Sequence, residues 1–181
     1  TYVTFFHTTH SIPDSLGIVF HTSEGAIVHT GEFKFDQSAK GKYRPDIAKI
    51  AGLGEDGVFI LLSDSTEAER PGYTTSEAVI ENQLSETFHA AKGRILVALY
   101  ASNFIRIQQV IDKAIETGKK VAIAGKSLEN IFEIGLDLGY FTVEEETIIS
   151  IKEISKYNDE NIVVIVSGTQ GEPLETKKKM I

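Results

Sequence analysis

FFHTTHSIPDS, residues 5–15, and HTGEFKFD, residues 29–36, are the two stretches that decide the fold of this chain. Each stretch begins in a short apolar run typical of a β-strand and ends in polar residues beside Gly or Pro. This pattern places His10 and Glu32 at strand ends, where a rigid sheet can aim potential metal ligands into a cleft. We therefore expect a β-rich region with His10 and Glu32 at one edge.

The composition allows an ordinary globular core and restricts the chemistry of any metal site. The chain has 181 residues, of which 41% are hydrophobic, and this length suits one domain or parts of two. Because it contains no Cys, disulfides and thiolate ligands are excluded, so a metal would be held by His and carboxylates. The net charge of −8 argues against a broad nucleic-acid-binding surface, although a local basic groove is compatible with it.

The two ends of the chain resemble cut ends. Thr1 leads at once into a strand-like run, and the chain stops at residues 177–181 (KKKMI), where a helix is expected to start after Pro173. We expect an internal piece of a longer protein, with Lys177–Lys179 on a solvated face. The chain has no run of about 18 apolar residues and no signal peptide at its start, so we expect no membrane partner and a cytoplasmic location.

Residues 1–56 are expected to form part of a β-rich domain. The apolar runs at residues 17–22 and 26–30 flank Ser23-Glu24-Gly25, which predicts a hairpin. A short helix is predicted over residues 46–53, with Gly54 near its end. Two strands cannot form a stable domain alone, so this region needs partners from elsewhere.

From Val58 onward, short apolar strands alternate with amphipathic helices, which favours a doubly wound parallel α/β sheet over residues 57–181. Strands are expected at residues 58–62, 95–100, 121–124, 148–151 and 162–166. Helices are expected from a Thr74–Glu77 capping box toward Ala91, from Phe104 to Gly118, and from a Ser127 N-cap to Gly139.

Polar turns follow four of these strands, and in a parallel sheet such turns gather at the carboxyl edge. The turns are residues 63–66 (SDST), 101–103 (ASN), 125–127 (GKS) and 167–172 (SGTQGE). Their hydroxyls and backbone N–H groups suit contacts with phosphate or sugar. We therefore predict that Asp64 and the turn at residues 167–172 lie on the same edge of one sheet.

The order of these motifs resembles the ribonuclease J family over essentially the whole chain. The blocks at residues 5–15 and 29–36 are similar to the third and fourth ligand motifs of its metallo-β-lactamase fold. The turns in LLSDST, ASNFIRIQQ, GKS and SGTQGEP resemble those of its β-CASP domain. The resemblance implies part of a metallo-β-lactamase αββα fold over residues 1–56, followed by a β-CASP domain over residues 57–181 that is incomplete at its C-terminal end.

The resemblance also implies an activity: 5′-exonucleolytic and endonucleolytic RNA hydrolysis in rRNA processing and mRNA decay, with two divalent ions, Zn or Mn. It implies that His10 is a metal ligand and that Glu32 occupies the place of a bridging aspartate. Asp64 matches the acidic residue of β-CASP motif A and would orient a histidine ligand without touching the metal. The implied RNA contacts are Ser65, Ser102, Asn103, Ser167, Gly168, Thr169 and Gln170.

Three positions depart from the ribonuclease J pattern. Glu32 replaces the bridging aspartate, Ile105 stands where active relatives carry His, and His7 stands where Arg is common. The HxHxDH signature and the later β-CASP histidines are absent from this segment. These departures favour a weakly active paralogue that acts as partner subunit of an active ribonuclease J, in homo-oligomers, mixed assemblies or an RNA-degradation assembly. The segment alone is predicted to be inactive, because two ligands are fewer than the three that a catalytic zinc needs.

Two other interpretations stay open. The first is a fully active ribonuclease in which two ions activate water and stabilise the phosphoryl transition state. The second is a nucleotide-binding α/β module without hydrolytic activity, which is disfavoured because no G-x-G-x-x-G or Walker A motif follows a strand. On ordinary grounds His7, His21 and His29 would be packing or surface residues, and Asp64 would cap a turn or helix.

Overall fold

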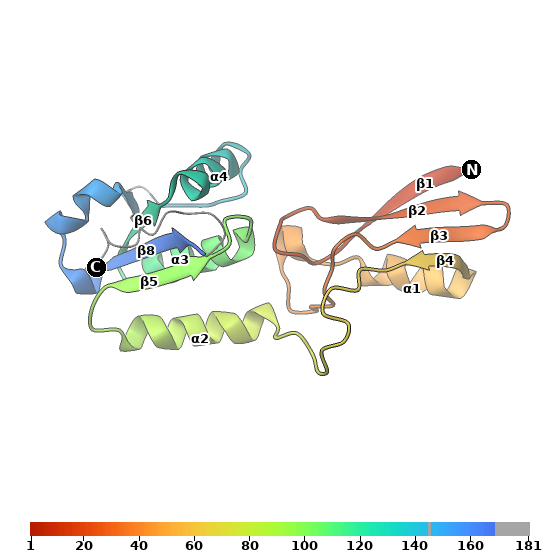
Figure 1. Cartoon of the computed structure of the whole chain (residues 1–181), viewed down its shortest axis with the longest axis horizontal. Helices are drawn as coiled ribbons and strands as arrows, with labels where there is room; N and C mark the ends of the chain where they lie inside the picture. Colours follow the sequence, from red (N-terminus) through yellow and green to blue (C-terminus); the bar gives the residue numbers. More distant parts are fainter. Residues whose placement is uncertain (145, 169–181) are drawn as a thin grey trace. The chain divides into compact units, whose positions relative to one another are not determined.

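The computed structural model describes residues 1–144 and 146–168, and the chain folds into two compact units (Figure 1). Unit 1 is Thr1–Ile80 and unit 2 is Glu81–Ile181. The division falls within helix α2 (Glu77–Ala90), whereas the sequence suggested a boundary after residue 56. The assignment of residues 57–181 to one domain stays a prediction.

Unit 1 is a four-stranded sheet with a helix against one face. The strands are β1 (Tyr2–His7), β2 (Leu16–Thr22), β3 (Gly25–His29) and β4 (Val58–Leu62), in the order β1-β2-β3-β4. The helix is α1 (Ile47–Asp56), and a 3-10 turn, η1 (Gly41–Tyr43), precedes it. The core of the unit consists of buried Phe6, Val19, Ala26 and Val28, packed against Ile50 and Leu53 of α1.

The hairpin predicted around Gly25 is confirmed. Strands β2 and β3 pair antiparallel from Ile18 opposite His29 to Thr22 opposite Gly25. The Thr22 hydroxyl donates to the Gly25 carbonyl over 2.7 Å, and Gly25 adopts a φ of 127° that L-residues rarely adopt. The turn chemistry therefore sets the register that brings the end of β3 back toward the start of β2.

The prediction that Val58–Leu62 opens the parallel sheet of the second region is wrong. Strand β4 pairs parallel with β3, in the sheet of unit 1. A parallel neighbour requires a crossover connection, and the segment between β3 and β4, which contains α1, supplies it. Asp64 follows β4, whereas Ser167 is the last residue of a strand in the other sheet, so the prediction of one common edge is also wrong.

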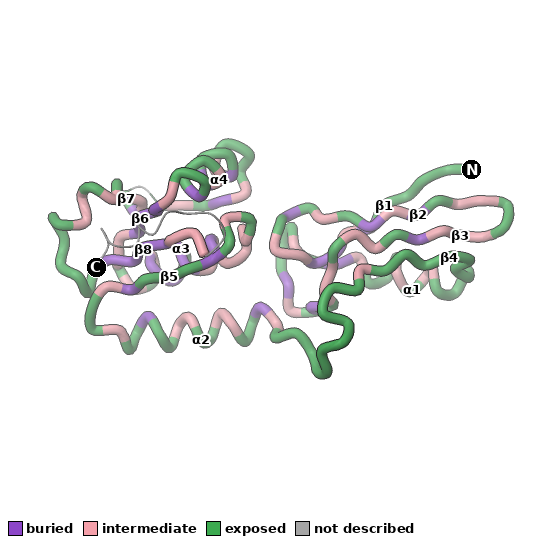
Figure 2. The backbone as a smooth tube through the Cα atoms, in the orientation of Figure 1, coloured by how far each residue is buried: buried purple, intermediate pink, exposed green. Residues whose placement is uncertain are grey.

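The face of the unit 1 sheet opposite α1 is apolar and open among the described residues. The register places Val3, Phe5, Phe20, Ile60 and Leu62 on this face, and each side chain is exposed. Figure 2 shows β4 as exposed along its length. Because exposed apolar patches of this kind mark surfaces that are covered in use, this face fits the expectation that the region needs partners.

Unit 2 is a parallel sheet, as predicted. Its order is β5-β8-β6-β7, with β5 (Ile95–Leu99), β6 (Lys120–Ala124), β7 (Ile148–Ile149) and β8 (Ile162–Ser167). Every neighbouring pair is parallel. The remaining helices are α3 (Phe104–Glu116), α4 (Lys126–Asp137) and the 3-10 helices η2 (Ile151–Lys156) and η3 (Asp159–Asn161).

Strand β8 lies at the centre of unit 2 and is buried on both faces (Figure 2). Val163 and Ile165 pack into the core shared with α2, α3 and α4, whereas Ile162 and Val164 pack toward η2. Two-sided burial explains why this strand is an unbroken apolar run.

Among the described residues, no helix is both long enough and apolar enough to cross a membrane.

Two predicted helix starts differ from the structure. Helix α4 begins at Lys126 with Gly125 as its N-cap, so Ser127 lies inside the helix. Gly125 adopts a φ of 116°, which lets the chain pass from β6 into the helix two residues earlier than a Ser127 cap would. Helix α2 begins at Glu77, and the hydroxyl of Ser76 accepts a bond from the Val79 N–H, in place of the predicted Thr74 cap.

Candidate functional site

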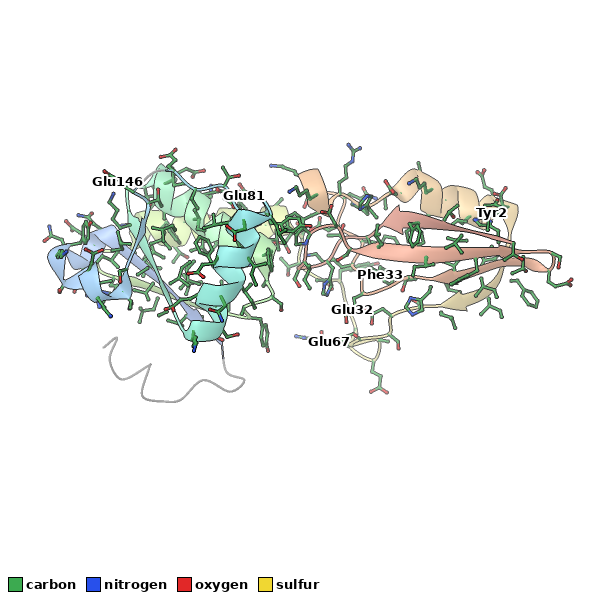
Figure 3. All side chains as sticks on the ribbon, turned by 90° about the horizontal axis from the view of Figure 1, so that it is seen from above. Tyr2, Glu32, Phe33, Glu67, Glu81 and Glu146 are labelled. Carbon is green, nitrogen blue, oxygen red and sulfur yellow. The ribbon has the colours of Figure 1, made fainter. Side chains whose placement is uncertain are left out.

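His10 and Glu32 lie side by side in the loops that follow β1 and β3. The distance from His10 Nε2 to Glu32 Oε2 is 3.1 Å. The Glu32 side chain, which is labelled in Figure 3, is 74% exposed, and the His10 side chain is 30% exposed, so solvent reaches both. The predicted side-by-side placement is confirmed, but the expectation that the two strands are neighbours is wrong, because β2 lies between β1 and β3. The metal-binding role of the two residues stays a prediction.

A short backbone bridge places the pair. Thr9 and Lys34 form an antiparallel bridge, in which the Lys34 N–H donates to the Thr9 carbonyl over 2.8 Å. The Thr8 hydroxyl donates to the Glu32 carbonyl over 3.3 Å. Thr8 and Thr9 are buried, so the two loops are joined beneath the half-buried His10 and the exposed Glu32 side chains.

Gly31 makes possible the close approach of the loop after β3 to the start of β2. It has a φ of 63°, and a Cβ at this position would lie 2.6 Å from the carbonyl oxygen of Leu16. A backbone oxygen cannot give way as a flexible side chain does, so a larger residue would move the chain just before Glu32. The backbone conformation and the contact with Leu16 therefore explain why the HTGE motif has glycine at position 31.

The Asp64 carboxylate lies beside this pair and is held by its own turn. Asp64 Oδ1 accepts bonds from the Thr66 hydroxyl at 2.7 Å and the Thr66 N–H at 2.9 Å. Oδ2 accepts a long bond of 3.5 Å from the Phe33 N–H. The Thr66 hydroxyl is the main cause that lowers the pKa of Asp64, and His10 contributes in the same direction.

These contacts give Asp64 the turn-capping role that an aspartate commonly has. The Asp64 N–H also donates to the Thr30 hydroxyl over 3.0 Å, which ties the end of β4 to the loop that carries Glu32. Its role in orienting a histidine ligand stays a prediction. Ser65, predicted to contact RNA, is exposed in the same turn.

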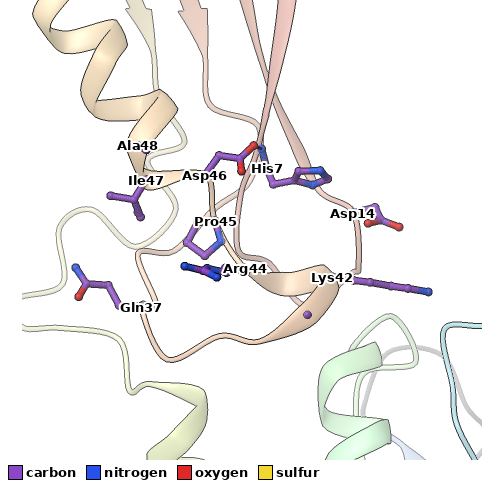
Figure 4. Close-up of a pocket in the computed structure, with 10 residues that line it drawn as sticks. His7, Asp14, Gln37, Lys42, Arg44, Pro45, Asp46, Ile47 and Ala48 are labelled. Atoms are coloured by element: carbon purple, nitrogen blue, oxygen red, sulfur yellow. Dashed lines mark hydrogen bonds between the residues drawn. The ribbon is translucent and has the colours of Figure 1, made fainter.

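A hollow of about 810 Å³ lies beside the end of β1 (Figure 4). His7, Lys42, Arg44 and Asp46 are among its lining residues, whereas His10, Glu32 and Asp64 are not. Asp46 accepts from the His7 N–H over 3.0 Å, and this bond is the main cause that lowers the pKa of Asp46. His7 thus lines this hollow and binds Asp46 through its backbone N–H.

In unit 2, Ser102, Asn103, Ser167 and Gly168 lie at the carboxyl edge of the sheet. Strands β5 and β8 end together with Leu99 opposite Ser167, and the Gly168 N–H donates to the Leu99 carbonyl over 2.6 Å. The Asn103 side chain caps α3 by accepting from the Arg106 N–H over 3.2 Å. The structure therefore brings these four together, and the predicted contacts Thr169 and Gln170 lie outside the described residues.

One cluster of charged residues was missed by reasoning from the sequence. Lys34 Nζ lies 2.6 Å from Glu77 Oε1 and 3.5 Å from Asp36 Oδ2, and both carboxylates are almost fully buried. We call this set the Lys34 cluster: Lys34, Asp36 and Glu77. The only local signal was a charged residue at every second position of EFKFD, since alternation in an extended segment points Lys34 and Asp36 away from the aromatic residues between them.

His10 and Glu32 have the donor atoms of a metal site but form only part of a ligand set. Imidazole nitrogen and carboxylate oxygen both suit Zn or Mn. Within residues 1–144 and 146–168, no group of three or more His, Cys, Asp or Glu side chains is placed to hold a metal ion. The pair therefore fits one side of a metal site that needs further ligands.

Comparison with known proteins connects the chain to ribonuclease J. Residues 92–181 match the family described as Ribonuclease J, beta-CASP domain. Over 178 residues, 98% of the chain, it is 53% identical to Ribonuclease J 2 of Staphylococcus aureus and 54% identical to Ribonuclease J 2 of Staphylococcus saprophyticus. The chain spans 32% of the length of these curated relatives.

The fold also has a counterpart among solved structures. The crystal structure of a protein of unknown function from Enterococcus faecalis V583 matches 93% of this chain with a TM-score of 0.57. The match spans 41% of that chain, and the sequences are 13% identical. At this identity the likeness shows the fold alone.

Proposed function

We propose that this chain is a segment of a ribonuclease J-family protein, and that its parent is a weakly active RNA-processing and RNA-decay ribonuclease that partners a more active ribonuclease J. The observation that carries the proposal is Glu32, which stands beside His10 where the family resemblance implies an aspartate. The identity to proteins named Ribonuclease J 2 supports the same assignment.

The length of Glu32 supports impaired catalysis. Ions of a two-metal site are about 3.5–4 Å apart, and their carboxylate ligands lie at about 2.0–2.2 Å. The extra methylene of Glu moves the carboxylate by about 1 Å or more, and displacements of this size can lower the rate on the order of 100-fold. In this structure the Glu32 carboxylate and the His10 imidazole contact each other at 3.1 Å.

His10 and Glu32 are the residues of this segment that would hold the metal, with the other ligands in the rest of the parent. Two divalent ions, Zn or Mn, would supply activated water and charge stabilisation. The Ser11 hydroxyl lies 3.4 Å from His10 Nδ1, which leaves Nε2 directed at Glu32 and suited to metal binding. Asp64 holds the neighbouring loop through Phe33 and Thr30.

The test is Glu32→Asp in the full-length protein, assayed for hydrolysis of a 5′-monophosphorylated RNA with Mn²⁺. We expect the rate to rise by about 10–100-fold, because the shorter side chain restores the bridging position. Glu24→Asp is the matched control, since Glu24 is exposed in the β2–β3 turn. The proposal fails if the unmodified protein already hydrolyses RNA at the rate of its Asp-bearing relative. That result would support the alternative of a fully active ribonuclease.

The proposal extends to partners. RNA would contact Ser65, Ser102, Asn103, Ser167, Gly168, Thr169 and Gln170, and the parent would assemble as a homo-oligomer, with an active ribonuclease J, or within an RNA-degradation assembly in the cytoplasm. The shared edge position of Ser102, Ser167 and Gly168 supports the RNA-facing part. Retained RNA binding without hydrolysis in the unmodified protein would favour the binding subunit over the enzyme.

A further inference from the structure

We propose that the Lys34 cluster is a clamp that positions Glu32 and His10 by fastening their loop to the first turn of helix α2. Lys34, Asp36 and Glu77 are positioning residues in this proposal and do not touch the metal. The metal-affinity part of the test rests on the proposed function, whereas the clamp itself rests on the geometry of unit 1.

Three charged groups meet in the clamp. Lys34 Nζ lies 2.6 Å from Glu77 Oε1 and 3.5 Å from Asp36 Oδ2, and it also donates to the Thr75 carbonyl at 3.4 Å. The side chains of Asp36 and Glu77 are 3% and 10% exposed. One cation thus lies between two buried carboxylates, so its removal leaves like charges close together in a poorly hydrated place.

The clamp also supplies the N-terminal cap of α2. Asp36 Oδ2 accepts from the Glu77 N–H over 2.7 Å, and the Ser38 hydroxyl accepts from the Ala78 N–H over 3.4 Å. Asp36 Oδ1 in turn accepts from the Ser38 N–H and hydroxyl, at 2.9 and 2.6 Å. A carboxylate at a helix N-terminus is favourable because it binds free N–H groups at the positive end of the helix dipole.

Lys34 connects this clamp to the candidate metal ligands. Its side chain ends in the clamp, while its N–H donates to Thr9, the residue before His10, over 2.8 Å. Glu32 lies two residues before Lys34, and its carbonyl accepts from Thr8. A shift of Lys34 would therefore move the segments that carry His10 and Glu32. Fraying of the first turn of α2 alone would move neither segment.

Hydrogen exchange in the full-length protein tests the clamp without any metal. We expect Lys34→Met to accelerate amide exchange on the order of 10-fold in residues 8–10 and 32–38 as well as in residues 77–80, because these segments open together. The matched control is Lys156→Met, which removes an exposed pair of equal length, 2.6 Å to Glu153, from unit 2. Faster exchange confined to residues 77–80, or no change, would show that the cluster only caps the helix.

Mn²⁺ affinity, measured by calorimetry on the same proteins, tests the consequence for the site. Lys34→Met should weaken binding by about 10–100-fold, as loss of a residue that orients ligands typically does, and Lys34→Arg should recover most of it. Unchanged affinity in a folded Lys34→Met protein would overturn the positioning role. If the unmodified protein binds no Mn²⁺ while the exchange result holds, the proposed function fails and the clamp stands.

A second variant keeps the proposal testable if Lys34→Met does not fold. Glu77→Gln preserves the size of the side chain and one oxygen for Lys34, so circular dichroism should show a folded protein. It should give the same exchange pattern as Lys34→Met with a smaller amplitude. Unaltered exchange in residues 8–10 and 32–38 of folded Glu77→Gln protein would contradict the clamp.

Discussion

At the scale of single residues, the segment at residues 30–38 carries two carboxylates with opposite environments, one exposed and one buried. Glu32 is exposed and contacts His10, so its carboxylate is available for binding. Asp36 is buried and its oxygens accept bonds from Ser38, from the Glu77 N–H and from Lys34. The same short segment therefore carries an exposed candidate ligand, Glu32, and a buried structural carboxylate, Asp36.

Asp36 predicts an acid-sensitive step in stability. Burial alone would raise the pKa of Asp36, but the Ser38 hydroxyl, the N–H groups of Glu77 and Ser38, and Lys34 outweigh it and lower the pKa below 3.8. A lowered pKa stabilises the folded state above pH 3.8, and this contribution is lost as the pH falls through the folded-state value. Asp36→Asn should therefore destabilise the full-length protein by about 1.5–3 kcal/mol at neutral pH and by less in acid.

Thermal unfolding of the Asp36→Asn and unmodified proteins between pH 3 and pH 7 measures this difference. Asp56→Asn is the control, because Asp56 is exposed at the end of α1. A melting-temperature difference that is the same at every pH would contradict the assigned role of the carboxylate.

At the scale of elements, the close packing of β1 on β2 depends on Gly17. Phe6 and Gly17 are register partners, and a Cβ on Gly17 would lie 2.2 Å from Phe6 Cζ. Phe6 is buried in the core of unit 1 together with Val19 and Val28. The absence of a side chain at Gly17 thus leaves the space on β2 that the ring of Phe6 fills.

Gly17→Ala should destabilise the full-length protein by about 1–3 kcal/mol, the usual cost of overpacking a core. Phe6→Leu in the same protein should recover part of the loss, because leucine lacks the ring atoms that meet the new methyl group. Gly52→Ala serves as control, since nothing lies within 4 Å of a Cβ there, and it should be neutral or stabilising. Chemical denaturation compares the unmodified protein with Gly17→Ala, Phe6→Leu, the double variant and Gly52→Ala. Additive effects of Gly17→Ala and Phe6→Leu would refute the contact.

At the scale of the whole molecule, the segment holds two units and an incomplete site. Unit 1 leaves an apolar sheet face exposed and unit 2 carries turns that are predicted to face RNA, while the chain spans 32% of the length of its curated relatives. The segment supplies two candidate metal ligands, His10 and Glu32, whereas a catalytic zinc requires about three protein ligands. The candidate chemistry therefore belongs to the parent protein and cannot be completed by this segment.

We expect the purified segment, residues 1–181, to show no ribonuclease activity with Mn²⁺ or Zn²⁺, because residues 1–144 and 146–168 hold no group of three metal-binding side chains. The assay compares the segment with the full-length protein on one RNA substrate, with and without a chelator. The same segment with His10→Ala serves as a control for contaminating nuclease. Chelator-sensitive hydrolysis that His10→Ala abolishes would contradict the expectation.

The sequence by itself determined the features that depend on neighbouring residues. Apolar runs bounded by Gly and polar residues predicted the β2–β3 hairpin, the helix α3 and the parallel strands of unit 2, since turn chemistry and periodicity act over a few residues. The hairpin also predicted the contact of His10 with Glu32, because it returns the chain to the same edge. Only the tertiary structure decided that β4 joins β3, because an apolar strand carries no mark of its partner. It alone brought Asp36 and Lys34 to Glu77, across 41 and 43 residues, since such contacts depend on the packing of α2 and not on local pattern.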